Sequence, residues 1–227
     1  MAAQCGAPAV QADAGIDQVS PERAPLDGLP DTSPQTYRRW AWPGLCAVLA
    51  LLSGSVWLAG RSGDWAWQPI GWPGQAGLLW SAPLAPESGV QWVAGALALL
   101  VLAVLGQVLD AGPRAALAAL RAWPLGTAGL GLWPAITSHA GMSGQLCGLW
   151  AVLGVHAVAR AAVRPWGLAM LAMLAAKLLT DQAWWHPVGY DPAWGDNLHY
   201  AAHLSGALAG LASAWAVQAA ASRNGHR

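Results

Sequence analysis

Apolar residues fall into long blocks separated by short polar breaks, and a polar segment precedes the first block. The apolar blocks span residues 40–59, 90–109, 115–133, 141–159, 165–180 and 198–220. Most of them approach the roughly 20 residues that a helix needs to cross a bilayer. The pattern therefore predicts an all-α, polytopic membrane protein with six transmembrane helices.

The segments outside the blocks divide the chain into three parts. Residues 1–37 are rich in Pro, Asp, Ala and Gly without apolar periodicity, which predicts a disordered tail. Residues 38–222 form the predicted six-helix membrane domain, and residues 223–227 a short second tail. Between the first two blocks, residues 61–89 are rich in Trp, Gly and Pro and are interpreted as an interfacial loop.

Composition agrees with a membrane protein. Of 227 residues, 56% are hydrophobic and 10% are charged, whereas soluble domains carry about 25% charged residues. This small number of charges cannot cover a water-facing surface. We therefore expect a lipid bilayer around the chain. The net charge of zero gives no indication of a nucleic-acid partner. Cys5, Cys46 and Cys147 lack metal-type spacing, and neither a disulfide framework, a metal nor a cofactor is expected.

The arginines predict the orientation in the membrane. They precede the first block, lie between the second and third and between the fourth and fifth, and follow the sixth: Arg38, Arg39, Arg114, Arg121, Arg160, Arg164, Arg223 and Arg227. The opposite ends of the blocks carry Arg61 and Lys177, with Asp191 and Asp196 nearby. Because cytoplasmic loops are enriched in positive charge, we expect both termini in the cytoplasm. The blocks at 141–159 and 198–220 then enter from the outer side.

Ser143 and His203 occupy matching places in these two blocks. Arg160 follows Ser143 by 17 residues, and Arg223 follows His203 by 20 residues. At about 1.5 Å rise per residue, the two side chains lie at depths that agree within roughly 5 Å. Serine is a poor nucleophile until a base takes its proton, and histidine has a suitable pKa. The spacing therefore predicts a nucleophile, Ser143, and its general base, His203.

Small residues provide a way for the two helices to meet. Gly144 and Gly148 form a stripe in one block, and Gly206 and Gly210 form another that shares a face with His203. Such stripes let membrane helices approach closely. Contact between the stripes would turn His203 towards the start of the other helix.

Stabilisation of an oxyanion is expected at the start of the block at 141–159. The first backbone N–H groups of a helix are unpaired and lie at the positive end of its dipole. They are natural donors to the oxyanion of a tetrahedral intermediate. Gly141, Gly144 and His139 are the predicted supporting residues there.

The same residues form two motifs, Gly141-x-Ser143-Gly144-x-x-x-Gly148 and Ala202-His203-x-x-Gly206-x-x-x-Gly210. These motifs resemble those of the rhomboid family of intramembrane serine proteases, and their order and the one intervening helix agree with it. The resemblance implies a six-helix rhomboid-like bundle. It also implies that Ser143 and His203 act as a dyad without an acidic third member.

Within that family the chain looks most like the rhombosortases, which tend to carry a Lys and an acidic residue where Lys177 and Asp181 stand. An ordinary i,i+4 ion pair at a helix end accounts for this pair equally well. The resemblance implies single-pass membrane substrates with a Gly-Gly motif before a C-terminal transmembrane anchor. Cleavage near the outer face of a bacterial inner membrane would release or re-anchor them.

Two departures from the rhomboid pattern favour an alternative. Ala94 and Ala98 stand near the places of the rhomboid His-x-x-x-Asn motif, which helps to form the oxyanion hole, and Cys147 stands where many rhomboids have an aromatic residue. Oxyanion support is then left to backbone donors, His139, Gln91 or Asn197. The alternative is a catalytically weak or inactive rhomboid-like protein that binds membrane helices.

The histidines raise a further alternative, haem held between membrane helices. Its candidate ligands are His139, His156, His199 and His203, but His156 lies near the inner end of its block without a histidine partner there. The pair His199 and His203 has the spacing of two zinc ligands, but no Glu follows His199 as in the H-E-x-x-H motif.

Overall fold

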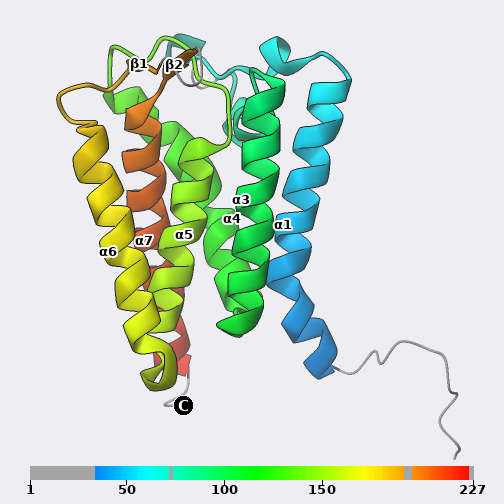
Figure 1. The fold of residues 1–227 in the computed structure, drawn as a ribbon, viewed down its shortest axis with the longest axis vertical. Coiled ribbons are helices and arrows are strands. Elements are labelled where there is room, and N and C mark those ends of the chain that lie inside the picture. The colour runs from blue at the N-terminus through cyan, green and yellow to red at the C-terminus, as the bar shows by residue number, and fades with distance from the viewer. Residues whose placement is uncertain (1–33, 72–73, 192–195, 225–227) are drawn as a thin grey trace, which may run out of the picture. The chain divides into compact units, whose positions relative to one another are not determined.

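The computed structural model describes residues 34–71, 74–191 and 196–224. Within these ranges the chain is mostly helical, which confirms the all-α prediction (Figure 1). The long helices are α1 (Pro34–Leu58), α3 (Gly89–Val108), α4 (Pro113–Gly129), α5 (Ser143–Val158), α6 (Arg164–Asp181) and α7 (Tyr200–Asn224). Between them lie the short helical segments η1 (Ser62–Trp65), η2 (Pro69–Gly71), α2 (Leu78–Ser81), η3 (Ala82–Leu84), η4 (Leu130–Leu132) and η5 (Ala161–Val163). Two short strands, β1 (Gly189–Asp191) and β2 (Asp196–Leu198), pair antiparallel.

The first and last helices extend beyond the predicted membrane domain. α1 begins at Pro34, so residues 34–37 are helical although they were assigned to the N-terminal tail. α7 continues to Asn224, past the predicted end at residue 222. Residues 1–33 and 225–227, which make up the rest of the two predicted tails, lie outside the described residues.

The stretch at 61–89 is more ordered than the predicted loop. Its described part contains η1, η2, α2 and η3. Pro69 starts η2 and Pro83 lies in the first turn of η3. Proline suits the start of a helix because its φ is already helical and its missing N–H has no partner there. These turns are too short to produce apolar periodicity, which is why the pattern did not predict them.

Within the part of the chain that the structure describes, four helices are long and apolar enough to cross a membrane. They cover Arg38–Leu58, Gly89–Val108, Ala161–Asp181 and Tyr200–Arg223. α5 is apolar but has only 16 residues, and α4 carries Arg114 and Arg121 within its 17 residues. Large apolar side chains such as Leu51, Val104 and Leu168 are exposed on the long helices, as expected where lipid covers a surface. The helices therefore indicate a membrane protein with at least four candidate spans.

Glycines bring α7 into backbone contact with α5 and α4. A Cβ atom on Gly206 would overlap the carbonyl group of Gly144, and one on Gly210 would overlap that of Gly148. On the other side of α7, a Cβ on Gly126 of α4 would lie 3.2 Å from the Cα atom of Gly206. Such close approach is typical of small-residue packing between membrane helices. The first turns of α5 and α7 consequently lie side by side.

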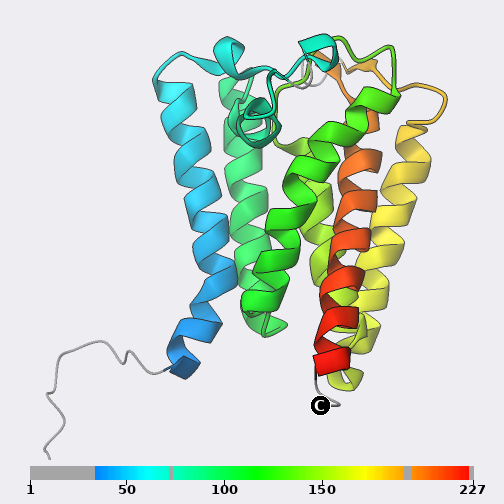
Figure 2. The same cartoon turned by 180° about the vertical axis from the view of Figure 1, so that it is seen from behind.

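The arginine-rich ends of the helices lie together. Figures 1 and 2 show the start of α1, the α3–α4 and α5–α6 connections and the end of α7 at one end, with β1 and β2 at the other. Arg38, Arg39, Arg114 and Arg160 line one cavity at the first end. This agrees with the sequence-based grouping of positive charge, while the side of the membrane that it faces stays a prediction.

Candidate active site

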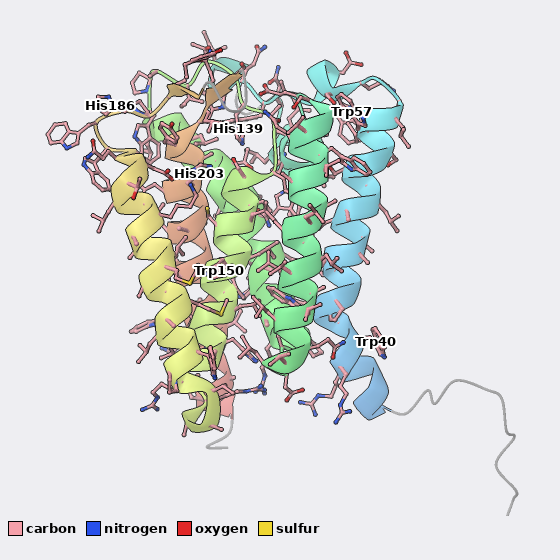
Figure 3. All side chains as sticks on the ribbon, viewed as in Figure 1. Trp40, Trp57, His139, Trp150, His186 and His203 are labelled. Atoms are coloured by element: carbon pink, nitrogen blue, oxygen red, sulfur yellow. The ribbon has the colours of Figure 1, made fainter. Side chains whose placement is uncertain are left out.

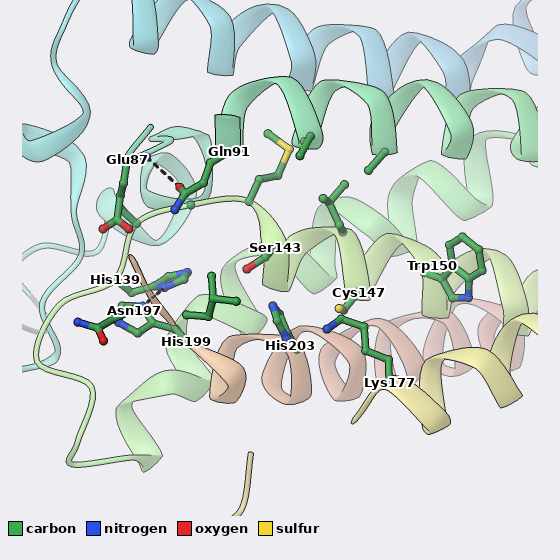
Figure 4. Close-up of a pocket in the computed structure, with 18 of the residues that line it drawn as sticks. Glu87, Gln91, His139, Ser143, Cys147, Trp150, Lys177, Asn197, His199 and His203 are labelled. Atoms are coloured by element: carbon green, nitrogen blue, oxygen red, sulfur yellow. Dashed lines mark hydrogen bonds between the residues drawn. The ribbon is translucent and has the colours of Figure 1, made fainter. Parts of the chain in front are cut away.

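A cavity of about 550 Å³ opens near the end of the helices that carries β1 and β2. Its walls come from α3, from the loop before α5, and from the facing parts of α5, α6 and α7 (Figure 4). The polar residues that line it include Gln91, His139, Ser143, Lys177, His199 and His203. Figure 3 shows His139 and His203 at this end and Trp40 at the opposite end. The cavity has the size of a typical ligand pocket.

Ser143 is the first residue of α5 and its side chain is exposed to the cavity. The residue before it, Met142, provides no side-chain cap. Met142 O accepts from the N–H of Leu146 at 2.9 Å, so the first turn is closed by the backbone. Since the first N–H groups of a helix lack intrahelical partners, those of Ser143 and Gly144 remain available beside the serine.

Gly141 sets the course of the chain into α5. Its φ angle is +105°, a region that favours glycine. Its N–H donates to Ala82 O at 3.0 Å. Gly141 was predicted to support an oxyanion, but this bond already occupies its amide. Its contribution is to position Ser143 through the turn.

Gly144 and the glycines of α7 place His203 beside this turn. A Cβ on Gly144 would lie 2.5 Å from Ala202 O, immediately before His203 in the chain. His203 is 4% exposed, and its ring lies next to Ser143 in the cavity (Figure 4). Among the hydrogen bonds of the described residues, none joins the Ser143 hydroxyl to this ring. Nucleophile–base contacts are often loose before substrate binds.

An acidic residue holds the far side of the His203 ring. Its Nδ1 lies 2.7 Å from Asp181 Oδ2, and Lys177 Nζ lies 2.9 Å from the same carboxylate oxygen. The resemblance implies a dyad without an acidic member, whereas the structure places Asp181 on the His203 ring. That the dyad acts without this carboxylate stays a prediction. An Nδ1–H that donates to the carboxylate leaves Nε2 as the acceptor, which is the tautomer a general base requires.

The sequence identified Lys177 and Asp181 only as a helix-end pair. It did not predict the bond to His203, because that depends on how residues 182–199 return the chain to α7. Asp181 is the last residue of α6, and Gln182 follows with a φ of +49°. This left-handed residue ends the helix and turns the chain. One signal in the sequence could have predicted the contact between Asp181 and His203, namely the matching depths of the two residues along their helices.

His139 pairs with His199 at the rim of the cavity. Their Nδ1 atoms are 3.1 Å apart, so one ring donates to the other. The backbone of His139 exchanges two hydrogen bonds with Trp67, at 2.8 and 2.9 Å. Burial lowers the pKa of His139 to about 3, with smaller contributions from His199 and His203. The ring is therefore neutral at pH 7 and serves as a rigid polar wall beside Ser143.

The remaining histidine of the haem alternative lies elsewhere. His156 is in the last turn of α5 and lines a different cavity, so it cannot share a ligand with His139, His199 or His203. Within the described residues there is no group of three or more His, Cys, Asp or Glu side chains arranged to hold a metal ion.

Gln91 offers a side-chain donor from α3. Its N–H donates to the capping side chain of Ser88 at 3.2 Å, and its Oε1 accepts from the N–H of Glu87 at 3.0 Å. This arrangement resembles a capping box. Because the oxygen is used by the cap, the amide NH₂ must be the group that faces the cavity (Figure 4). Ala94 and Ala98, one and two turns further on, line the same wall without polar groups.

In comparisons with protein families, with curated proteins and with solved structures, the chain has no match. The geometry of the cavity is therefore the basis for assigning a function.

Proposed function

We propose that the chain is an intramembrane serine endopeptidase with a rhomboid-like six-helix bundle, which cleaves single-pass membrane proteins. The observation that carries the proposal is the bond between His203 and Asp181 in a cavity that Ser143 also lines. A buried histidine with its Nδ1 on a carboxylate and Nε2 free for a nearby serine has the arrangement of a catalytic base. This cavity lies between helices that are apolar enough to face lipid.

The reaction follows from the positions of these groups. Ser143 Oγ attacks the carbonyl carbon of the scissile peptide bond while His203 Nε2 takes its proton. Asp181 stabilises the imidazolium through Nδ1–H, and Lys177 Nζ donates to the same carboxylate. Collapse of the tetrahedral intermediate breaks the C–N bond, and His203 returns the proton to the leaving amine. Water then attacks the acyl-enzyme while His203 takes its proton. The ester bond to Ser143 Oγ breaks, His203 returns the proton to Oγ, and the carboxyl product leaves.

Two groups of donors support the oxyanion. The first N–H groups of α5, including those of Ser143 and Gly144, lie at the positive end of the helix dipole. The Gln91 amide faces them across the cavity from α3. This side chain would do the work that the rhomboid His-x-x-x-Asn motif does, from one turn nearer the start of the helix.

The substrate class rests on the resemblance to rhombosortases. It implies a Gly-Gly motif before a C-terminal transmembrane anchor, and processing near the end of the bundle that carries β1 and β2. The small residues Ala94, Gly95 and Ala98 line one wall of the cavity and leave space there for the substrate backbone.

The test combines labelling with processing of a substrate. The full-length protein in membranes should react with a fluorophosphonate probe and shorten a co-expressed protein with a Gly-Gly transmembrane tail. Ser143→Ala should abolish both signals and His203→Ala should nearly do so. Ser55→Ala and His186→Ala, which change exposed residues outside the cavity, are the matched controls. Processing by the Ser143→Ala and His203→Ala variants at the parent rate would refute the proposal.

A second candidate is an inactive rhomboid-like protein that binds membrane helices. The absence of a Ser143–His203 hydrogen bond among the described residues favours it, as do Ala94 and Ala98 on the wall of the cavity. It predicts no labelling of Ser143, together with retention of a transmembrane partner that is equal in the parent and in Ser143→Ala.

A further inference from the structure

A second cavity, of about 880 Å³, lies at the arginine-rich end of the helices. It is formed by the start of α1, the turn between α3 and α4, the end of α5 and the last turns of α7. Its basic residues are Arg38, Arg39, Arg114, His156 and Arg160. None of its lining residues is shared with the cavity that holds Ser143.

One arginine of this cavity is structural. Arg160 NH1 donates to Leu109 O at 2.6 Å and to Asp110 O at 2.9 Å, and its NH2 lies 3.4 Å from Asp110 Oδ2. These bonds cap the carbonyl end of α3 and hold the end of α5 against it. Asp110, the one carboxylate that lines the cavity, therefore forms its ion pair with Arg160.

The other three arginines of the cavity have no carboxylate partner among the described residues. Arg38, Arg39 and Arg114 are exposed, and none of them forms an ion pair within the described residues. Exposed, unpaired guanidinium groups that converge on one cavity attract an anion, and their planar fork of N–H donors fits the oxygens of a phosphate.

The start of α4 adds to this attraction. Arg114 lies in its first turn, where a positive side chain is unfavourably placed relative to the helix dipole. The N-cap residue, Gly112, has no side chain to accept from the N–H of Arg114, while its carbonyl accepts from Ala115 and Ala116. Gly112 and Arg114 both line the cavity. An anion bound there would relieve the charge on Arg114 and interact with the positive end of α4.

The α7 wall of the cavity is mixed, with the apolar Trp215, Ala219 and Ala221 beside the polar Gln218 and Ser222. Trp215 on α7 lines it and is 73% exposed, and Ala219 lies one turn further along. α1 packs against α3 and α4, whereas α7 packs against α4 and α5. A ligand in the cavity would therefore bridge α1 and α7 with a charged part on the arginines and an apolar part on Trp215.

We propose that this cavity binds the phosphate headgroup of an anionic phospholipid. The phosphate lies among Arg38, Arg39 and Arg114, and the glycerol and first acyl carbons lie along Trp215 and Ala219. Basic pockets between membrane helices bind lipid headgroups by this chemistry. The inference stands independently of the proposed proteolysis, because it uses none of the residues of that site.

The experiment measures lipid binding to the full-length protein in detergent by native mass spectrometry. The probes are dioleoylphosphatidylglycerol and, as the uncharged comparison, dioleoylphosphatidylcholine. The test variant is Arg38→Gln/Arg39→Gln/Arg114→Gln. The matched control is Arg121→Gln/Arg164→Gln/Arg223→Gln, which loses the same charge outside the cavity. Each arginine is worth about fivefold in affinity for an anionic lipid, so the test variant should bind phosphatidylglycerol roughly a hundredfold more weakly and the control should bind as the parent does.

Further variants and soluble competitors identify the source of the phosphate and test whether misfolding explains a loss of lipid binding. Arg38→Lys/Arg39→Lys/Arg114→Lys should retain most of the binding, and Arg114→Gln alone should lose about fivefold. Inorganic phosphate and glycerol 3-phosphate should compete poorly, since they lack the part that contacts Trp215. Equal loss in the two triple glutamine variants, no preference over phosphatidylcholine, or strong competition by inorganic phosphate would each overturn the proposal.

Discussion

Asp181 determines what the His203 ring can do. A neutral histidine has two tautomers, and only the one protonated on Nδ1 offers Nε2 as a base towards Ser143. The carboxylate at 2.7 Å from Nδ1 selects that tautomer and holds the ring orientation. Lys177 holds the carboxylate in turn, at 2.9 and 3.1 Å from its two oxygens. The three side chains belong to two adjacent helices, and they form a chain of bonds that ends at His203, beside the proposed nucleophile Ser143.

The substitution Asp181→Asn tests this chain of bonds. The side chain keeps its shape, but its NH₂ group can donate to Nδ1 and so favours the tautomer that cannot accept from Ser143. We expect the rate of substrate cleavage to fall by about 10⁴-fold, as tautomer reversal does in a serine protease triad, with little change in thermal stability. Asp64→Asn, at an exposed aspartate of η1, is the control. Parent-like cleavage by Asp181→Asn would show that His203 works without this carboxylate.

Substitutions at Gln91 and Ser88 separate a loss of catalysis from a loss of stability. Gln91→Glu keeps an oxygen for the N–H of Glu87 but removes the NH₂ that faces the cavity. Loss of one oxyanion donor costs about 10²- to 10³-fold in kcat, and we expect a loss of that size with KM nearly unchanged. Ser88→Ala removes the cap of α3 and should cost about 1 kcal/mol of stability while keeping the donor. If the two variants lose activity equally, Gln91 acts only through the cap.

At the scale of the helices, the site depends on how closely α5 and α7 approach. Gly144 and Gly206 are in backbone contact, and Gly126 of α4 lies against the other side of Gly206. No side chain fits between three backbones at this distance. The position of Ser143 relative to His203 is therefore set by residues that carry no chemistry of their own.

Gly206→Ala should show this dependence. The added Cβ would overlap the Gly144 carbonyl, and overpacking of this kind costs about 1–3 kcal/mol. We expect a lower thermal midpoint and a larger loss of cleavage than the loss of stability alone explains. Gly44→Ala is the matched control, because a Cβ at Gly44 of α1 meets nothing within 4 Å. A Gly206→Ala protein that is as stable and active as Gly44→Ala would contradict the packing argument.

The helices could be predicted from the sequence, while the contacts across them could be predicted only in part. Apolar blocks of sufficient length located all the long helices within a few residues, and glycine stripes indicated that α5 and α7 meet. The pairing of His203 with Asp181 was not predicted. The apolar pattern within a helix does not show where the connection after α6 places the start of α7. The cap that orients Gln91 was missed for a similar reason, since it depends on the N–H of Glu87 rather than on a pattern along α3.

In the helical part of the molecule, the candidate active site and the arginine-lined cavity lie at opposite ends. The cavity with Ser143 and His203 opens near β1 and β2, and the arginine-lined cavity lies at the other ends of α5 and α7. Moving an arginine through the centre of a bilayer costs about 2.5–3.5 kcal/mol on insertion scales. Four arginines in one cavity therefore strongly favour a single orientation. In that orientation the proposed proteolysis takes place near the outer face of the membrane.

Reporter fusions test that orientation. Green fluorescent protein fused after Arg227 should fluoresce, because it folds in the cytoplasm, and alkaline phosphatase fused there should be inactive, because its disulfides do not form in that compartment. Alkaline phosphatase inserted after Gly74, in the connection at the β1–β2 end, should be active. Arg38→Glu/Arg39→Glu should lower the fraction of correctly oriented chains, since it weakens the charge bias at the first helix, whereas Arg61→Glu at the opposite end should not. An active phosphatase after Arg227 would place the serine and histidine at the cytoplasmic face. That result would exclude substrates whose anchors are cut from outside, even if Ser143 proved to be a nucleophile.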